Sequence, residues 1–133
     1  MTDELPRPTE AETAILSVLW ARGPSTVRQV HDALADRGTG YTTVLKLMQI
    51  MAHKGLLRRD ESRRSHVYEP TIDQGAMQHR WVDDLLERGF GGSTSALVLR
   101  ALSSKRASAA ELARIRALLD ALEADPDDGG DLG

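Results

Sequence analysis

Residues 41–70 read YTTVLKLMQIMAHKGLLRRDESRRSHVYEP, and they give the clearest indication of the fold class. Its first half carries apolar residues at the spacing of one helix face, namely Val44, Leu47, Met48 and Met51. The pattern predicts a helix from about Thr42 to Lys54, with Gly55 as its stop. Two short β-compatible runs follow at 56–59 and 65–69, and the polar segment 60–64 separates them. The second half therefore predicts a two-stranded hairpin with an exposed, basic tip, ended by Pro70.

Two further helices are predicted before this stretch. Thr9 with Glu12, and Thr26 with Gln29, form capping boxes, in which paired side chains satisfy free backbone amides at a helix start. The first helix is expected to end at Gly23-Pro24 and the second at Gly38. Three short helices followed by a basic hairpin is the order of a winged helix-turn-helix, whose third helix enters the major groove of DNA.

Basic residues gather beside the predicted third helix. Residues 38–70 hold six Lys and Arg against three Asp and Glu, a local charge of +3, although the whole chain carries −3. A local excess of positive charge of this kind is typical of nucleic-acid-binding proteins. The candidate DNA-binding residues are Thr42, Thr43, Lys46, Gln49, Lys54, Arg63, Arg64 and His66, and Arg58 and Arg59 are further candidates for neutralising phosphates. Two alternatives stay open: the charges are solvated surface charges, and Thr42 is an N-cap.

The C-terminal half predicts helices over about 73–88, 95–102 and 109–124, the last beginning at a third capping box, Ser108 with Glu111. Its apolar residues form the candidate dimerisation surface: Trp81, Leu85, Leu97, Leu112, Ile115, Leu119 and Leu122. The alternative is that this face packs inside one monomer against the first three helices. The predicted domains are a winged-helix domain at 1–70, a helical dimerisation domain at 71–124 and a disordered acidic tail at 125–133.

Composition narrows the function further. The chain has 133 residues and no cysteine, which removes disulfides, thiolate metal sites and cysteine nucleophiles, and no apolar run approaches the roughly 18 residues of a membrane span. We expect a cytoplasmic protein with no cofactor, no metal and no catalytic residue. His31, His53, His66 and His79 form no metal-binding pair at helical spacing, so a small hydrolase is only a formal option. A winged-helix module that binds protein instead of DNA is the main alternative, and the acidic pair Asp60-Glu61 favours it.

Several of these segments resemble one family. YTTVLKLMQIMAHKGLLRR at 41–59, RSHVYEP at 64–70, FGGSTSALVLRAL at 90–102 and ELARIRALLDALE at 111–123 are similar to the penicillinase and methicillin-resistance repressors (BlaI/MecI-like). The likeness covers roughly residues 7–124. It implies a homodimeric transcriptional repressor that binds a palindromic operator in double-stranded DNA, with intertwined C-terminal helices.

Carried over residue by residue, the resemblance places Thr42, Thr43 and Lys46 on the recognition helix and Arg63, Arg64 and His66 on the wing. Ile50 and His53 depart from the family, which often has basic residues at those positions. Family members that govern β-lactam resistance are inactivated by cleavage of an Asn-Phe bond, whose place corresponds to Arg100-Ala101 in a chain that contains no Asn. The clustered cysteines of copper-sensing relatives are also missing. The resemblance also leaves open the possibility that a membrane sensor protease is a partner of this protein.

Overall fold

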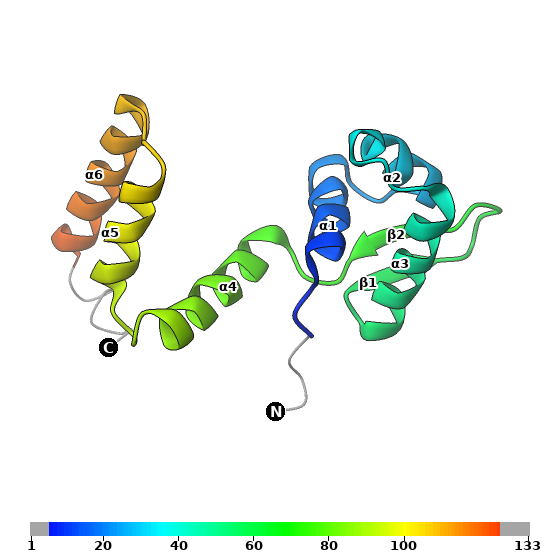
Figure 1. Ribbon diagram of the computed structural model, residues 1–133, viewed down its shortest axis with the longest axis horizontal. Helices are drawn as coiled ribbons and strands as arrows, with labels where there is room; N and C mark the ends of the chain where they lie inside the picture. The colour runs from blue at the N-terminus through cyan, green and yellow to red at the C-terminus, as the bar shows by residue number, and fades with distance from the viewer. Residues whose placement is uncertain (1–5, 126–133) are drawn as a thin grey trace. The chain divides into compact units, whose positions relative to one another are not determined.

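The computed structural model describes residues 6–125, and its element order is that of a winged helix followed by three helices. Figure 1 labels the helices and strands, which in chain order are α1 (Glu10–Arg22), α2 (Val27–Ala33), α3 (Tyr41–Lys54), β1 (Leu57–Asp60), β2 (Val67–Pro70), α4 (Gln74–Gly89), α5 (Thr94–Ser104) and α6 (Ala109–Ala124). A short 3-10 turn, η1 (Ala35–Arg37), lies between α2 and α3. The mainly helical fold with one small hairpin is confirmed. Apart from Asp125, the predicted acidic tail lies outside the described residues.

The three predicted capping boxes form at α1, α2 and α6 and are confirmed. At α1, the Glu12 amide donates to the Thr9 hydroxyl over 3.1 Å, and the Thr9 amide donates to the Glu12 carboxylate over 3.0 Å. Helix α2 is shorter than predicted, because the chain tightens into η1 after Ala33 before Gly38 ends it in the left-handed conformation, with φ +73°.

Helix α3 passes directly into the hairpin. Gly55 ends the helix at φ +92°, where a side chain would be strained, and the Leu56 amide donates to the Met51 carbonyl over 2.9 Å. Strands β1 and β2 then pair antiparallel, with Leu57 opposite Pro70 and Asp60 opposite Val67. Ser25 and Tyr68 exchange two backbone hydrogen bonds, of 3.0 and 2.8 Å, which tie the hairpin to the loop before α2.

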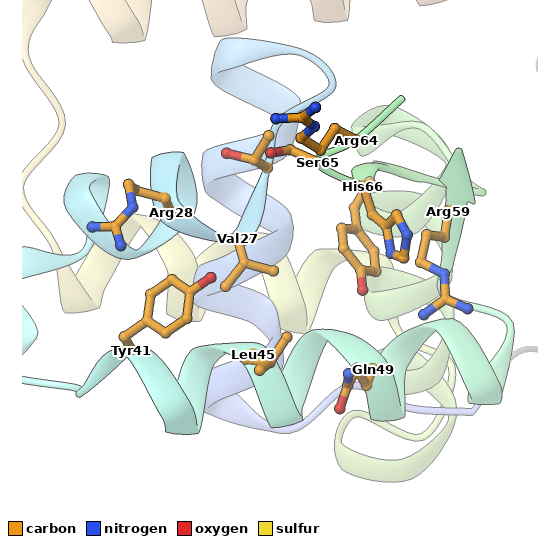
Figure 2. Close-up of a pocket in the computed structure, with 11 residues that line it drawn as sticks. Val27, Arg28, Tyr41, Leu45, Gln49, Arg59, Arg64, Ser65 and His66 are labelled. Carbon is orange, nitrogen blue, oxygen red and sulfur yellow. The ribbon is translucent and has the colours of Figure 1, made fainter. Parts of the chain in front are cut away.

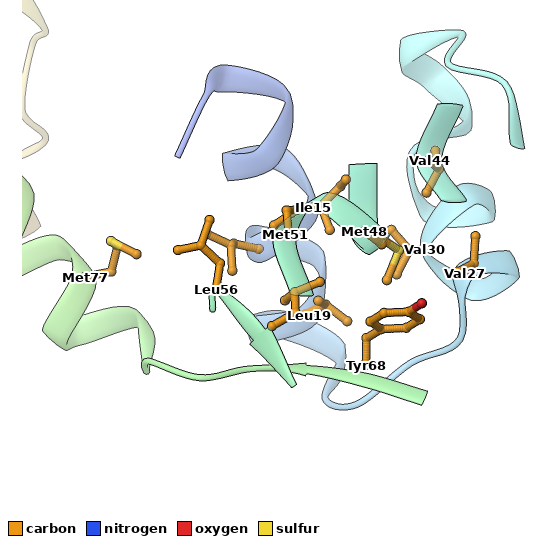
Figure 3. Packing of buried hydrophobic residues seen from close by; sticks show 12 residues of the cluster. Ile15, Leu19, Val27, Val30, Val44, Met48, Met51, Leu56, Tyr68 and Met77 are labelled. Carbon is orange, nitrogen blue, oxygen red and sulfur yellow. The ribbon is translucent and has the colours of Figure 1, made fainter. Parts of the chain in front are cut away.

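One mainly aliphatic core joins these elements (Figure 3). Its buried members are Ile15, Leu16, Leu19, Val27, Val30, Val44, Met48, Met51, Leu56, Leu57, Tyr68 and Met77. Leu47, which the sequence placed on the buried face of α3, is only half-buried. The core therefore holds α3 by one side, through Val44, Met48 and Met51, and leaves its opposite side in solvent.

The chain divides into two compact units, residues 1–82 and residues 83–133. The first unit extends beyond the boundary predicted at residue 70, because the start of α4 packs on the winged helix. Met77 is buried in the core, and Trp81 meets Trp20 edge to face with ring centroids 6.3 Å apart. The Trp20 indole N–H also donates to the Ile72 carbonyl over 3.0 Å.

The second unit contains α5 and α6, and neither helix has a buried residue. Within residues 6–125, no helix is both long and apolar enough to cross a membrane.

Candidate nucleic-acid interface

The exposed side of α3 carries the residues predicted to meet DNA. Thr42, Thr43, Lys46 and Gln49 are all exposed, and they share this side with Ile50 and His53. Within the described part of the chain, no hydrogen bond or ion pair engages the Lys46 side chain. Residues at these spacings lie on one side of a helix, so the four predicted residues are presented together.

Thr42 is not the N-cap of α3. Gly40 occupies that position, and Thr42 is the second residue of the helix. Gly40 has no side chain to bond the first amides, so no side-chain cap closes the start of the helix. The alternative that Thr42 serves as a cap is therefore wrong, and its hydroxyl remains at the exposed surface.

A groove of about 380 Å³ runs between α2, α3 and the hairpin. Figure 2 shows Arg28 beside the Tyr41 ring, Arg64, Ser65 and His66 on the hairpin side, and Val27 and Leu45 between. The complete lining is Thr26, Val27, Arg28, Tyr41, Leu45, Gln49, Arg59, Arg64, Ser65, His66 and Tyr68. Arg28 of α2, Arg59 of β1 and Arg64 of the loop between β1 and β2 thus line a groove that has no acidic residue in its lining.

The arginines of the groove are held in different ways. The Arg28 guanidinium lies 5.2 Å from the centre of the Tyr41 ring, a cation–π contact that leaves its N–H groups available. The Tyr68 hydroxyl and the Glu61 carboxylate raise the pKa of Arg59, and Arg59 forms an ion pair with Glu61. Arg64 is exposed and has no ion-pair partner within residues 6–125.

The other basic residues near α3 are partly neutralised. Lys54 donates hydrogen bonds of 2.8 and 3.1 Å to the two carboxylate oxygens of Glu12, which is 2% exposed. Arg58 pairs with Glu69 across the hairpin, 3.1 Å apart. Lys54 therefore holds α3 to α1, and the unpaired positive charge near α3 is smaller than the sequence count suggests.

The acidic pair on the hairpin is also occupied. Asp60 accepts the Ser62 amide over 2.9 Å, and this hydrogen bond lowers the pKa of the Asp60 carboxyl. Glu61 pairs with Arg59. Because both carboxylates have local partners, they give less support to the alternative of a winged-helix module that binds protein instead of DNA.

Sequence reasoning missed Arg28 and Tyr41. One signal was present: Arg28 follows directly after Val27, the first residue of α2, and a cation in the first turn opposes the helix dipole. An unfavourable charge of this kind suggests a role outside the helix. Nothing in the sequence showed that Tyr41 supports it, because the two residues are joined only by the packing of α2 on α3.

The predicted dimerisation residues lie in both units. Trp81 belongs to the first unit, where it packs against Trp20, so we expect it to stabilise the winged helix. The other six belong to the second unit: Leu97, Leu112 and Ile115 are half-buried, and Leu85, Leu119 and Leu122 are 48%, 54% and 50% exposed. Val98, Leu99, Leu102 and Leu118 add further exposed apolar surface there.

The three helices and the hairpin of residues 6–82 have the fold of a winged helix-turn-helix protein. Residues 8–121 match the family described as penicillinase repressor, so the chain belongs to that family. It is 36% identical over 124 residues to a transcriptional regulator BlaI of Mycobacterium tuberculosis (strains H37Rv and CDC 1551), covering 91% of this chain and 88% of the relative. It is 23% identical over 118 residues to a penicillinase repressor of Bacillus licheniformis, covering 88% and 92%. The family consists of transcriptional repressors and not of enzymes.

Proposed function

We propose that this chain is a homodimeric repressor that reads a palindromic operator with the exposed side of α3. One observation carries the proposal: Thr42, Lys46 and Gln49 face solvent together beside a groove lined by three arginines. Hydroxyl, ammonium and amide groups can bond base edges in the major groove, and arginines can hold the phosphates beside it. The names of the relatives, a transcriptional regulator and a penicillinase repressor, agree with this function.

The homodimer is supported by the second unit. No residue of α5 or α6 is buried, although both helices carry leucines that are half or more exposed. Apolar surface of this extent favours association. A twofold dimer would present two α3 helices to half-sites separated by one helical turn of DNA or a multiple of it.

Lys46→Ala tests the assignment of the reading face. We expect operator affinity to fall by about tenfold or more, because one good base contact discriminates by roughly 1–3 kcal/mol. The melting temperature should stay unchanged, since Lys46 is exposed and makes no ion pair within residues 6–125. Fluorescence anisotropy with an operator selected from random duplexes measures the affinity. Lys105→Ala, which removes the same charge from the end of α5, is the control. Equal affinities for both variants and the unmodified protein would contradict the assignment.

Arg28→Ala tests whether the groove holds a phosphate. Each neutralised phosphate contributes about 0.9 to the slope of log affinity against log salt, so the slope should fall by about one for each subunit. The loss of affinity should be similar for operator and random DNA, because phosphates carry no sequence. Arg116→Ala on α6 provides a control of the same charge. An unchanged slope would remove Arg28 from the interface.

A further inference from the structure

The exposed side of α3 carries two stripes along its length. Thr42, Lys46, Gln49 and His53 follow one another at spacings of 4, 3 and 4, and all are polar and exposed. Beside them run Thr43, Leu47 and Ile50, at spacings of 4 and 3. Since residues three and four apart stack on one side of a helix, the first stripe bears donors and acceptors, and the second bears methyl groups.

Ile50 is the unusual member of this surface. Its side chain is 38% exposed, and the other exposed side chains of α3 are Tyr41, Thr42, Thr43, Lys46, Gln49 and His53. A β-branched residue is a poor helix former and loses favourable burial when it faces water. Single exposed apolar residues are common, so exposure alone assigns no role. A role for Ile50 follows instead from its position, within the side of α3 that is proposed to enter the major groove of DNA.

We infer that Ile50, together with the γ-methyl group of Thr43, recognises the 5-methyl groups of thymines in the operator. This inference rests on the proposed function and deepens it by naming a base. Thymine presents a methyl group in the major groove, where the other bases present hydrogen-bonding atoms. The polar stripe would then bond base edges while the methyl stripe selects thymine beside them.

The spacing of the two residues makes the inference more specific. Ile50 lies seven residues after Thr43, which is about 10.5 Å along the helix axis at 1.5 Å per residue. Successive base pairs are about 3.4 Å apart along the duplex. The two methyl contacts therefore fall on different base pairs, and the operator half-site should contain at least two thymines whose methyl groups contribute to binding.

Replacing single thymines with deoxyuridine tests the inference directly. Deoxyuridine keeps the base pair and the O4 acceptor and removes only the methyl group. Duplexes selected by the full-length protein are substituted one thymine at a time, and affinities are measured for the unmodified protein and Ile50→Ala. We expect the unmodified protein to bind about fourfold more weakly when either of two thymines in a half-site is replaced, fourfold being the factor for burying one methyl-sized group. At one of the sensitive positions, Ile50→Ala should bind the thymine duplex and the deoxyuridine duplex with equal affinity.

Two controls separate this contact from general effects. Lys46→Ala should bind the operator more weakly yet keep the fourfold dependence on the methyl group. Val82→Ala, which shortens a side chain that is 43% exposed on α4, should change neither the operator affinity nor that dependence. Ile50→Val, a smaller truncation, should show an intermediate dependence. If Ile50→Ala remains as sensitive as the unmodified protein, or if no thymine methyl group affects binding, the inference is wrong while the proposed function stands. A protein that selects no DNA would overturn both.

Discussion

A chain that ends after Val82 is expected to be a folded monomer with operator affinity reduced by about 100-fold or more. Its core is complete, because Met77 and Trp81 remain packed on the winged helix. It lacks the exposed leucines of α5 and α6 that we propose to join two chains. Without that link the two half-sites are bound independently, and the gain from binding the second one intramolecularly is lost.

Sedimentation equilibrium and operator titration measure the two parts of this expectation, and circular dichroism checks that the shortened chain is folded. A chain that ends after Thr71 is the matched comparison. It loses Met77, Trp81 and the Trp81–Trp20 contact, so it should unfold at a lower temperature than the chain that ends after Val82. A dimer formed by residues 1–82 alone would contradict the role proposed for the second unit.

Lys54→Met is expected to lower the free energy of unfolding by about 3 kcal/mol, since it leaves a buried carboxylate without its cation. Glu12 is 2% exposed, and its carboxylate accepts hydrogen bonds from the Lys54 ammonium and the Thr9 amide. The methionine side chain keeps the length of the lysine stem, so packing changes little. Urea denaturation followed by tryptophan fluorescence measures the loss.

Glu12→Gln separates the charge from the packing. The glutamine can still accept the Thr9 amide, and Lys54, whose side chain is 31% exposed, can reach solvent, so this variant should lose less stability than Lys54→Met. The double variant should recover part of the loss of Lys54→Met, because no buried charge remains. A double variant as unstable as the sum of the single ones would show that the ion pair is not the cause.

The same pair produces a pH dependence. Burial raises the pKa of Glu12, but hydrogen bonds from Lys54 and from the Thr9 backbone outweigh it and hold the pKa below its ordinary value. A lowered pKa means that the stabilisation is complete above the ordinary carboxyl range and is lost as the pH falls through the folded-state pKa. Unfolding curves between pH 7 and pH 3 should show this loss in the unmodified protein and a smaller one in Glu12→Gln.

Local patterns predicted most of the winged helix. The capping pairs Thr9 with Glu12 and Thr26 with Gln29 marked two helix starts, and Gly55 marked the end of α3. These features depend on contacts within one turn of helix, which a sequence displays directly. The order of three helices and a basic hairpin then led to the fold class, and the position of Thr42, Lys46 and Gln49 on one helix placed them on a common surface.

Which basic side chains are left without an ion-pair partner depends on how the helices pack. Lys54 pairs with Glu12, 42 residues earlier in the chain, and Arg28 meets Tyr41 because α2 packs on α3. Tertiary packing also brings Trp81, which the sequence predicted at the dimer surface, into contact with Trp20. The amino-acid sequence alone was enough to predict the capped helix starts and the outward side of α3, since those depend on near neighbours, although it did not predict that α2 gives way to η1 after Ala33. Pairings between distant residues depend on how the elements pack, and no local pattern encodes them.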